Sequence, residues 1–505
     1  MRKTKTIAFA LVLAVFAGML AGCGGQTADS PSGPAAEENA GEEALDGKPA
    51  EDPEGKDDLP EFDFGGREFV FVVPANWPGI VYDIWTESEN GDLVNDAAYK
   101  RTLEVSDRFN VAVSDKKVEN IDQHITKNNA AGSVDYAAAW PLIRSYGKLS
   151  QQNMFVDLNE VTNIDLGKKY WDRNVVRDFT INGKLYGIMG DISTSVSYLT
   201  HLLGVNKTIA QDNGVSISEI YQSVREGRWT FDRLYAITKT IYKDLDGDGK
   251  RNYADVYGFG VSPAVHNAAF SASGEKWMVK DEKGELILMP LTERIVSVYE
   301  KLSEILSDYQ STLTTWNIGE VKSSMLTIPY EYVYIDKFAN NTVLFADIDV
   351  NIIMKYRQLM DTDFGIVPFP KFEESQPHYS VYAYQAYPML TVSSVYAGDA
   401  ESLEFIGAVL EGLAAASYRT LTPAFYDKSI STKYTRDDES IEMLDIILRS
   451  RIYDFMNIYD LGGLDSAIWA GIQTERFNIA SLFEKHQARI EKDIQKLVDA
   501  YAQND

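Results

Sequence analysis

The side chains with the clearest chemistry in this sequence are a run of acidic residues that begins at Asp244. Asp244, Asp246 and Asp248 alternate with other residues, and Gly249 follows at the position where such a loop turns. Asp255 is the twelfth and last residue of this loop. Oxygen ligands at alternating positions of such a loop suit Ca²⁺, and the glycine permits the sharp turn. The sequence therefore predicts a bound Ca²⁺ ion as a structural cofactor. Its expected ligands are Asp244, Asp246, Asp248, the carbonyl of Lys250, Asn252 and Asp255.

The last residue of this loop departs from the usual pattern. Asp255 stands where EF-hands carry Glu, and its shorter side chain reaches less far toward an ion. The segment also resembles the calcium loop of dockerins, which ends in Asp. The alternative is a turn rich in Asp and Gly that binds no ion, and the sequence leaves that alternative open. If the ion is present, it neutralises carboxylates that would otherwise repel one another, so its removal should cost stability.

A second set of candidates follows the expected strands and carries aromatic or hydrogen-bonding groups. Ligands of α/β domains bind beyond the carboxyl ends of strands. The chain has 29 Tyr, 22 Phe and 8 Trp, and a sugar ring packs its apolar face on such rings while its hydroxyls pair with carboxylates and amides. The candidate ligand residues on this argument are Asn76, Trp77, Trp140, Asn267, Phe270, Asp347 and Trp469. Core packing, helix capping and loop solvation are the competing roles for them. A Trp140→Ala variant should lower ligand affinity tenfold and still fold.

The N-terminus has the pattern of an export signal. Arg2, Lys3 and Lys5 precede an apolar run over residues 7–20, which is too short to span a bilayer as a helix. The small residues before Cys23 resemble the lipobox of bacterial lipoproteins, which implies that residues 1–22 are removed and that Cys23 carries a lipid. Cys23 is the only cysteine of the chain, so an intramolecular disulfide is excluded.

The stretch after Cys23 has the composition of a disordered spacer. Residues 23–64 are rich in Gly, Ala, Pro and Glu, and their acidic side chains far outnumber Lys48 and Lys56. A recognition tail for a basic partner is the alternative. The net charge of −27 leaves no basic stripe for the phosphates of a nucleic acid, so nucleic acid is excluded as a partner.

The remaining chain is long enough for two cores. Residues 65–505 alternate short apolar runs with longer helical patterns, which predicts an α/β fold in two domains. The expected strands cover residues 68–73, 134–140, 364–369 and 389–392. Apolar residues at helical spacing predict helices through residues 295–309, 441–452 and 483–501.

Several segments, taken in order, resemble the extracellular solute-binding proteins of ABC importers, the family that contains maltodextrin-binding and other sugar-binding members. The resemblance runs from about residue 66 to residue 500. The segments that carry it are Gly183–Gly187 leading into 195–207, Gly227–Leu234, Asp246–Gly249 before Tyr257–Phe259, Val343–Phe345, Asp363–Lys371 and Gln376–Tyr379.

This resemblance implies a two-lobe fold of periplasmic-binding-protein type II, with a ligand cleft between the lobes. The N-terminal lobe would comprise residues 65–180 and about 380–430, and the C-terminal lobe about 181–379 and 431–505. Asp191 would stand where the family has a carboxylate that binds sugar hydroxyls. The implied function is that of a monomer, held by its lipid at the outer face of the bacterial cytoplasmic membrane, which delivers a sugar or oligosaccharide to an ABC permease.

Other functions remain open at this point. The ligand could be a peptide, a polyol or a uronate, with Arg144 or Lys148 serving an acidic one, and the partner could be a membrane sensor in place of a permease. We expect no enzyme, because the sequence has no His-Glu-x-x-His, Gly-x-Ser-x-Gly or P-loop motif. A glycoside hydrolase needs only two carboxyl groups about 5 to 10 Å apart, and 75 acidic residues leave room for such a pair.

Overall fold

The structure is a computed structural model that describes residues 55–75, 83–262, 264–282, 284–317, 333–384, 386–430, 438–474 and 477–502. The chain divides into two compact units, Met1–Glu51 and Asp52–Asp505, and every described residue belongs to the second. The predicted signal segment, Cys23 and most of the predicted spacer lie outside the described residues. Among the described helices, none is long and apolar enough to cross a membrane.

The first sheet is parallel and is built around the strand nearest the N-terminus. β1 (Arg67–Pro74) lies between β2 (Val111–Val118) and β3 (Ala138–Ala139), with Phe71 of β1 opposite Ala138 of β3. The run of Phe and Val in β1 is buried, as expected for a central strand covered on both faces. We call this sheet and the helices around it the N-terminal lobe.

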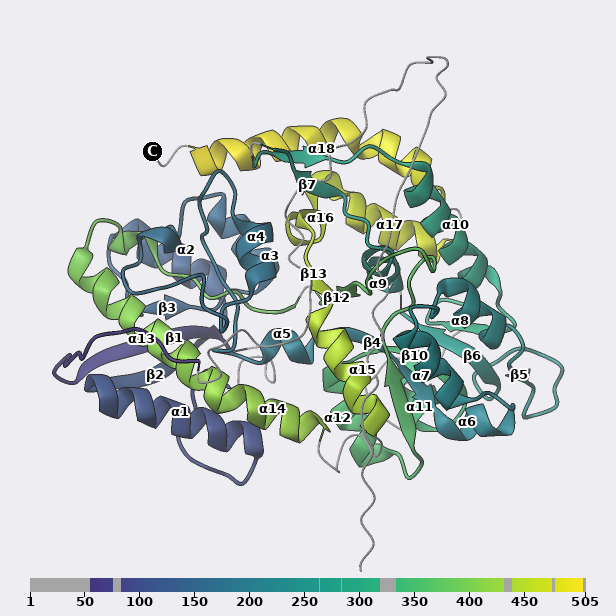
Figure 1. The fold of residues 1–505 in the computed structure, drawn as a ribbon. Coiled ribbons are helices and arrows are strands. Elements are labelled where there is room, and N and C mark those ends of the chain that lie inside the picture. The colour runs from purple at the N-terminus through teal and green to yellow at the C-terminus, as the bar shows by residue number, and fades with distance from the viewer. Residues whose placement is uncertain are drawn as a thin grey trace, which may run out of the picture. The chain divides into compact units, whose positions relative to one another are not determined.

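Helices from two distant parts of the chain cover this sheet. The long helix α1 (Leu93–Phe109) packs against α13 (Ala400–Arg419) and α14 (Leu421–Ile430), as Figure 1 shows. Asp92 caps α1 by accepting hydrogen bonds from the first-turn amides, and Asn110 ends it in the left-handed conformation. The shorter helices of this lobe are α2 (Ile121–Ala131), α3 (Ile143–Ser150), α4 (Arg173–Phe179) and the 3₁₀ turns η1 (Leu158–Glu160) and η3 (Ser394–Tyr396).

The segment just before β1 is docked on the N-terminal lobe. Asp57 forms a two-pronged ion pair with Arg108, at 2.7 and 2.9 Å, and the ring of Phe64 packs edge-on against Phe405. The predicted disordered spacer therefore extends too far, because residues 55–64 make specific contacts with α1 and α13. Apolar Leu59, Phe62 and Phe64 supply the buried surface that the rest of the spacer sequence lacks.

The second sheet is mixed and has the strand order β11-β4-β10-β6-β5, with β9 beside β6. Its central strand β10 (Val343–Asp349) runs parallel to β6 (Val256–Val261) and antiparallel to β4 (His201–Asn206). All three are almost wholly buried, because helices cover both faces. We call this sheet and its helices the C-terminal lobe. Its outer strands are β5 (Tyr242–Lys243), β9 (Thr312–Thr314) and β11 (Phe364–Val367).

The helices of the C-terminal lobe come mostly from between its strands. They are α6 (Lys207–Asp212), α7 (Ile217–Arg225), α8 (Phe231–Thr238), α9 (Val265–Ala272), α10 (Glu293–Ser307), α11 (Val333–Ala339) and α12 (Val350–Leu359). A hairpin of β7 (Met278–Lys280) and β8 (Leu286–Leu288) follows α9. Thr230 caps α8 and Thr292 caps α10 through their hydroxyl oxygens.

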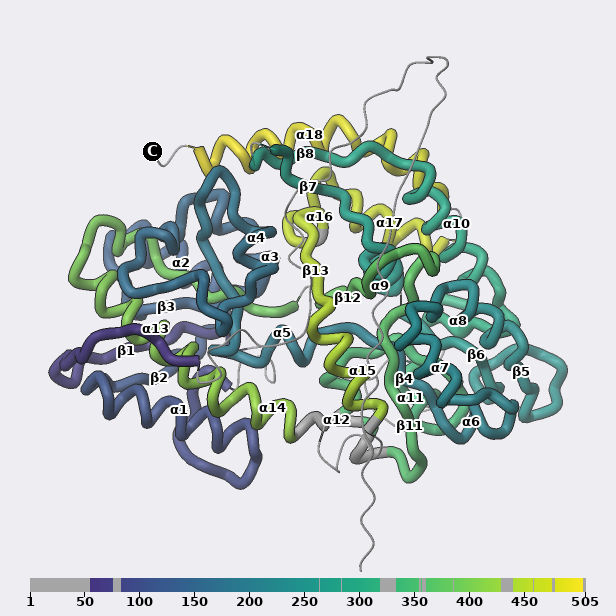
Figure 2. The backbone as a smooth tube through the Cα atoms, viewed as in Figure 1, coloured from purple at the N-terminus to yellow at the C-terminus, as the bar shows by residue number. Residues whose placement is uncertain are grey.

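Among the described residues, three segments cross between the two lobes, and we call them the crossing segments. They are residues 195–200, which contain α5 (Ser195–Tyr198), residues 381–384 and residues 450–453. β12 (Val381–Tyr382) pairs in parallel with β13 (Arg451–Ile452), and Ala383 forms a bridge with Thr200, so the three lie side by side. The trace in Figure 2 shows β12 and β13 running next to each other.

The C-terminal helices join both lobes. They are α15 (Asp438–Arg449), α16 (Phe455–Tyr459), the turn η4 (Leu461–Gly463), α17 (Leu464–Gln473) and α18 (Ile479–Ala502). Phe483 of α18 stacks on Trp277 in the C-terminal lobe, whereas Tyr501 at its other end meets the rings of Tyr146 and Tyr186 in the N-terminal lobe. The predicted assignment of residues 431–505 to the C-terminal lobe therefore does not hold for the end of α18, which packs on N-terminal-lobe rings.

Candidate functional site

A pocket of about 500 Å³ opens where the two lobes and a crossing segment meet. The start of α3 forms one side, α9 and the start of α17 form the other, and residues around β12 form the floor. We call it the Trp469 pocket. Its lining residues are Leu142, Arg144, Ser145, Ala264, Asn267, Tyr382, Tyr384, Ala386, Asp465, Ser466 and Trp469.

Trp469 gives this pocket an accessible aromatic surface. Its side chain lies on α17 and is 37% exposed, an unusual state for the largest apolar residue type. The ring meets His266 edge-to-face, with 6.2 Å between the centroids, so one neighbour fixes its orientation. The predicted role of Trp469 as a ligand residue is compatible with this position, since an open indole face packs against an apolar ring face.

A carboxylate lies one helical turn before Trp469 and is compensated from both lobes. Asp465 is buried and accepts a 2.9 Å hydrogen bond from the side-chain amide of Asn267 on α9. Its other oxygen lies 3.6 Å from the guanidinium of Arg144, which comes from α3 of the N-terminal lobe. The sequence predicted Asn267 and named Arg144 only for an acidic ligand. The pocket thus has hydrogen-bond donors, from Asn267 and Arg144, and an acceptor, Asp465, next to the ring of Trp469.

Buried His266 lies beside this group, with its Nε2 atom 3.6 Å from Asp465. Burial lowers the pKa of His266 below the ordinary value, and the nearby charge of Asp465 only partly opposes that effect. Its buried Nδ1 atom has no hydrogen-bond partner among the described residues.

The floor of the pocket rests on a buried ion pair. His201 at the start of β4 pairs with Asp347 of β10 at 2.9 Å, and its ring lies against Tyr382 and Tyr384. Burial alone would lower the pKa of His201, but the charge of Asp347 and their hydrogen bond raise it above the ordinary value. Asp347, predicted as a ligand residue, therefore lies beneath the lining tyrosines and does not line the pocket.

Two predicted aromatic ligand residues lie in the core instead. Trp140 is 1% exposed and packs beside Phe71, because its backbone amide continues the sheet by donating to Val72 and its side chain faces inward. Phe270 is 1% exposed and stacks against Trp277 and Tyr299, at centroid distances of 4.7 and 5.8 Å. Neither residue lines the Trp469 pocket.

The other predicted ligand residues lie elsewhere. Asn76 and Trp77 fall outside the described residues. Asp191 lines a separate, smaller pocket that shares no lining residue with the Trp469 pocket. Its carboxylate accepts a 2.6 Å hydrogen bond from the hydroxyl of Thr422, and burial raises the pKa of Asp191 to about 6.

Sequence reasoning missed Tyr382, Tyr384 and Asp465. The two tyrosines belong to a crossing segment that carries no motif of its own, so only the fold brings them to the site. Asp465 had a usable signal, because it precedes Trp469 by four positions and residues at that spacing share one face of a helix.

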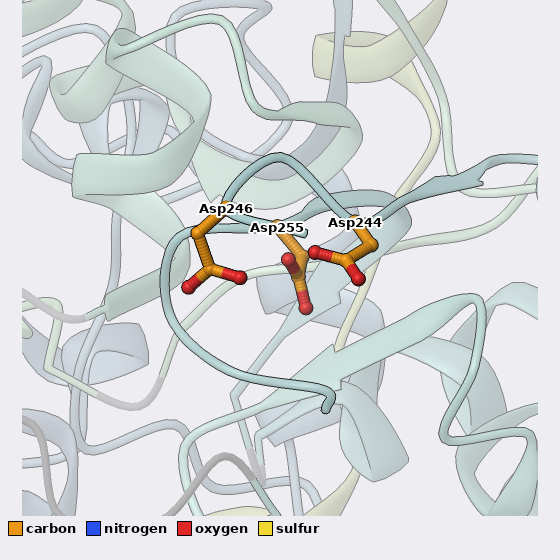
Figure 3. A group of neighbouring side chains, drawn as sticks. All are labelled: Asp244, Asp246 and Asp255. Carbon is orange, nitrogen blue, oxygen red and sulfur yellow. The ribbon is translucent and has the colours of Figure 1, made fainter. Parts of the chain in front are cut away.

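The predicted calcium loop connects β5 to β6 and brings three carboxylates together. Oxygen atoms of Asp244, Asp246 and Asp255 lie within 4.8 Å of one another (Figure 3), close enough to share one ion. Asp255 is buried and accepts hydrogen bonds from the Tyr242 hydroxyl and the Asn252 amide, at 3.1 and 2.9 Å. The donor set suits a hard cation such as Ca²⁺.

The remaining predicted loop ligands are engaged within the loop itself. Asp248 accepts a hydrogen bond from the backbone amide of Lys250 at 2.7 Å, and the Asn252 side chain donates to Asp246 at 2.8 Å. The carbonyl of Lys250 accepts a weak 3.4 Å contact from the same amide of Asn252. The hydrogen bond from Asn252 lowers the pKa of Asp246, which keeps that carboxylate ionised.

Comparison with solved structures identifies the fold. The galacto-N-biose-/lacto-N-biose I-binding protein of the ABC transporter of Bifidobacterium longum matches with a TM-score of 0.56 at 12% identity, over 86% of this chain and 98% of that one. A cyclo/maltodextrin-binding protein complexed with maltotetraose matches with a TM-score of 0.54 at 13% identity, over 85% and 98%. UgpB from Mycobacterium tuberculosis, in complex with glycerophosphocholine, matches with a TM-score of 0.52 at 15% identity, over 86% and 99%.

These matches confirm the predicted two-lobe α/β fold of solute-binding proteins. The chains are alike over almost their whole lengths, yet identities of 12 to 15% show the fold alone. No protein-family model matches the chain, and no curated protein matches it in sequence.

Proposed function

We propose that this protein is the extracellular binding component of an ABC importer and that it binds a sugar or short oligosaccharide in the Trp469 pocket. The observation that carries the proposal is an exposed indole face beside a compensated carboxylate, in a pocket lined by both lobes. Two structural neighbours support it, since one is a galacto-N-biose-/lacto-N-biose I-binding protein and the other is a cyclo/maltodextrin-binding protein complexed with maltotetraose.

The pocket has the groups that a neutral sugar requires. One face of a pyranose ring packs on Trp469, and the hydroxyls around the ring exchange hydrogen bonds with Asp465, Asn267 and Arg144. The charges of Asp465 and Arg144 already offset each other, so a ligand needs no net charge to bind there. Because the lining comes from both lobes, a bound ligand favours the arrangement in which they close on it.

A lipid on Cys23 would hold this receptor at the membrane that contains its permease. The acidic spacer then separates the lipid from the docked segment that begins at residue 55. Tethering raises the local concentration of the receptor near the permease, which a freely diffusing protein would not achieve. Mass spectrometry of the protein extracted from membranes tests this proposal, since an unmodified Cys23 would contradict it.

Two alternatives are less well supported. A glycoside hydrolase needs two carboxyl groups flanking the bond that it cleaves, and among the described lining residues of the Trp469 pocket Asp465 is the one carboxylate. A ligand other than a sugar is supported by the match to UgpB, which was solved in complex with glycerophosphocholine. Service to a membrane sensor would use the same pocket and differs only in the partner.

The test is a thermal-shift and calorimetric screen of the purified full chain against oligosaccharides, polyols, peptides and glycerophosphocholine. A ligand present at about a hundred times its dissociation constant stabilises the folded state by about 2.7 kcal/mol. We expect a shift with one class of sugar, a dissociation constant at least tenfold higher in Trp469→Ala, and a smaller loss in Trp469→Phe, which keeps a ring. Leu93→Ala, an exposed change on α1 outside the pocket, is the control and should bind as the wild type does. Stabilisation by peptides alone would contradict the proposal.

We also propose that the loop from Asp244 to Asp255 binds Ca²⁺ as a structural ion. The support is the close approach of three carboxylates, one of them buried, at spacings that suit an EF-hand loop. Asp244, Asp246 and Asp255 would hold the ion, and its charge would offset their mutual repulsion.

A further inference from the structure

A second pocket, of about 240 Å³, lies where the N-terminal lobe meets the crossing segments. We call it the Asp191 pocket. Its walls are the loop that leads into α4, the chain around α5, the first turns of α14 and the junction of α15 with β13. The residues that matter for its chemistry are Lys169, Asp172, Asp191, Thr422, Arg449 and Arg451.

Two of the charged groups in this pocket are already satisfied by the protein. Asp172 caps α4 by accepting from the amide of Asn174 at 2.9 Å, and it also accepts from the hydroxyl of Tyr453 at 2.9 Å. Arg449 forms an ion pair with Asp445 one turn earlier on α15, at 2.9 Å. These groups shape the pocket but have their own partners.

Two cationic groups in the same pocket retain unused donors. Arg451 donates to the hydroxyl oxygen of Ser197 at 2.9 Å and lies 3.8 Å from Asp172, yet its buried Nε atom has no hydrogen-bond partner among the described residues. The buried Nζ atom of Lys169 likewise has no such partner there, and it rests 4.7 Å from the centre of the Tyr418 ring. Buried charged donors without acceptors are costly, and an anionic ligand would relieve that cost.

Asp191 supplies the complementary acceptor. Its carboxylate accepts a hydrogen bond from Thr422, and Asp191 and Arg451 line the same pocket. A carboxylate oxygen accepts more than one hydrogen bond, so Asp191 can also receive a ligand hydroxyl. The pocket therefore combines cationic donors for an anion with an acceptor for a hydroxyl group.

We propose that the Asp191 pocket is a second ligand site, which takes a small polyhydroxy carboxylate. The ligand's carboxylate accepts from Arg451, with the charge of Lys169 in support, and one of its hydroxyls donates to Asp191. Charge-assisted hydrogen bonds of this kind are roughly twice as strong as neutral ones, so the carboxylate provides most of the selectivity. This site is independent of sugar binding at Trp469.

Isothermal titration of the full chain with gluconate and glucitol tests the proposal. The two probes share a hydroxylated chain and differ in one terminal carboxylate. We expect gluconate to bind at least tenfold more tightly than glucitol. In Arg451→Gln the dissociation constant of gluconate should rise at least tenfold, and in Lys169→Gln severalfold. Trp469→Ala, which alters only the other pocket, should leave it within twofold.

A second variant covers the case in which Arg451→Gln fails to fold, since Arg451 also contacts Ser197 and Asp172. Lys169→Gln then decides the matter, together with Arg451→Lys, which keeps the charge and should retain part of the affinity. Absence of gluconate binding would overturn the proposal. Equal affinity in wild type and Lys169→Gln, or loss of gluconate binding in Trp469→Ala, would overturn it as well.

Discussion

The Trp469 pocket and the Asp191 pocket differ in how their charges are arranged. In the Trp469 pocket the buried carboxylate of Asp465 already has Asn267 and Arg144 as partners, and an accessible aromatic ring lies beside it. In the Asp191 pocket the rings frame buried cationic nitrogen atoms that lack partners among the described residues. Compensated charges beside an open ring suit a neutral, hydroxylated ligand, whereas uncompensated donors suit an anion.

Both pockets depend on the crossing segments. Tyr382 of β12 lines the Trp469 pocket and Arg451 of β13 lines the Asp191 pocket, and these two strands are paired with each other. Tyr382 and Arg451 are 69 positions apart in the sequence. The pairing of their strands therefore brings a residue of each pocket close to the other pocket. This shared pair offers a route by which a ligand in one pocket can affect the other, and any such coupling must be reciprocal.

The largest expected effect is the loss of stability on substitution of Trp140. The sequence predicted this residue as a ligand residue, whereas the structure places it in the core. Trp140→Ala should destabilise the protein by about 3 to 5 kcal/mol, because removal of a buried tryptophan leaves a cavity. Urea unfolding measures this loss. Trp469→Ala is the matched control, with a loss of about 1 kcal/mol or less, since its side chain is 37% exposed. A Trp140→Ala protein that folds normally but has lost sugar affinity would return Trp140 to the site and break the comparison.

Removal of calcium is expected to act on stability and on neither pocket. At a Ca²⁺ concentration of a hundred times its dissociation constant, the free energy of unfolding should rise by about 2.7 kcal/mol over the chelated protein. Mg²⁺ should substitute poorly, because it demands stricter octahedral geometry. Thermal melts with chelator, Ca²⁺ or Mg²⁺ measure the difference.

The matched variants for this test are Asp246→Asn in the loop and Asp212→Asn at the end of α6, where the carboxylate is exposed and lies outside the loop. The first should lose the response to Ca²⁺ and the second should keep it. An unchanged melting temperature in the chelated wild type would show that the loop is held by its own hydrogen bonds.

The sequence predicted elements with strong periodicity and failed where position depends on distant chain segments. Amphipathic spacing located α10, α15 and α18, although α15 ends at Arg449 and the last predicted helical residues, Arg451–Ile452, form β13. β1 covers the predicted strand at 68–73, and β11 forms the first part of the one at 364–369. Of the expected strand at 134–140, only Ala138–Ala139 form a strand. Residues 389–392 form isolated bridges, such as the one between Thr391 and Ala139, in place of the expected continuous strand.

The candidate site could be predicted only in part for the same reason. Asn267 and Trp469 line the pocket, whereas Trp140 and Phe270, chosen by the same argument, lie in the core. At the end of a strand, the sequence alone does not determine whether a given side chain points into the core or into a pocket. A shift of one residue moves the side chain to the opposite face. Asp191 was chosen by resemblance, and its pocket is formed with Thr422 and Arg451, which no local pattern connects to it.

Asp191 should make the stability of the protein depend on pH in a way that the Asp191→Asn variant does not share. Burial raises the pKa of Asp191 to about 6 in the folded protein, above the value of an exposed carboxyl. The folded state therefore binds more protons than the unfolded state between about pH 4 and 6. This contribution to stability is fully present below pH 4 and is lost as the pH rises through 6. Relative to Asp191→Asn, the wild type should lose about 1 to 3 kcal/mol over that range, from about 1.4 kcal/mol per pKa unit.

Denaturant midpoints measured from pH 4 to pH 7 in both proteins check this expectation. Buried Asp454 and Glu411 also have raised pKa values, to about 6 and about 7, but they are unchanged in the variant and cancel in the difference. Parallel curves for the wild type and Asp191→Asn would mean that burial does not raise the pKa of Asp191, which would contradict this expectation.

The smallest expected effect concerns Arg144, the cation of the Trp469 pocket. Arg144 and Lys148 lie one turn apart on α3 with side chains 61% and 63% exposed, but only Arg144 lines the pocket, while Lys148 pairs with Asp122 at 3.8 Å. Exposed ion pairs contribute about 1 kcal/mol or less, so Arg144→Gln should weaken sugar binding by fivefold or less and Lys148→Gln should leave it unchanged. Calorimetry with the sugar found in the screen measures both. If Arg144→Gln costs more affinity than Trp469→Ala, then charge and not the indole face selects the ligand, and the two pockets recognise their ligands by the same means.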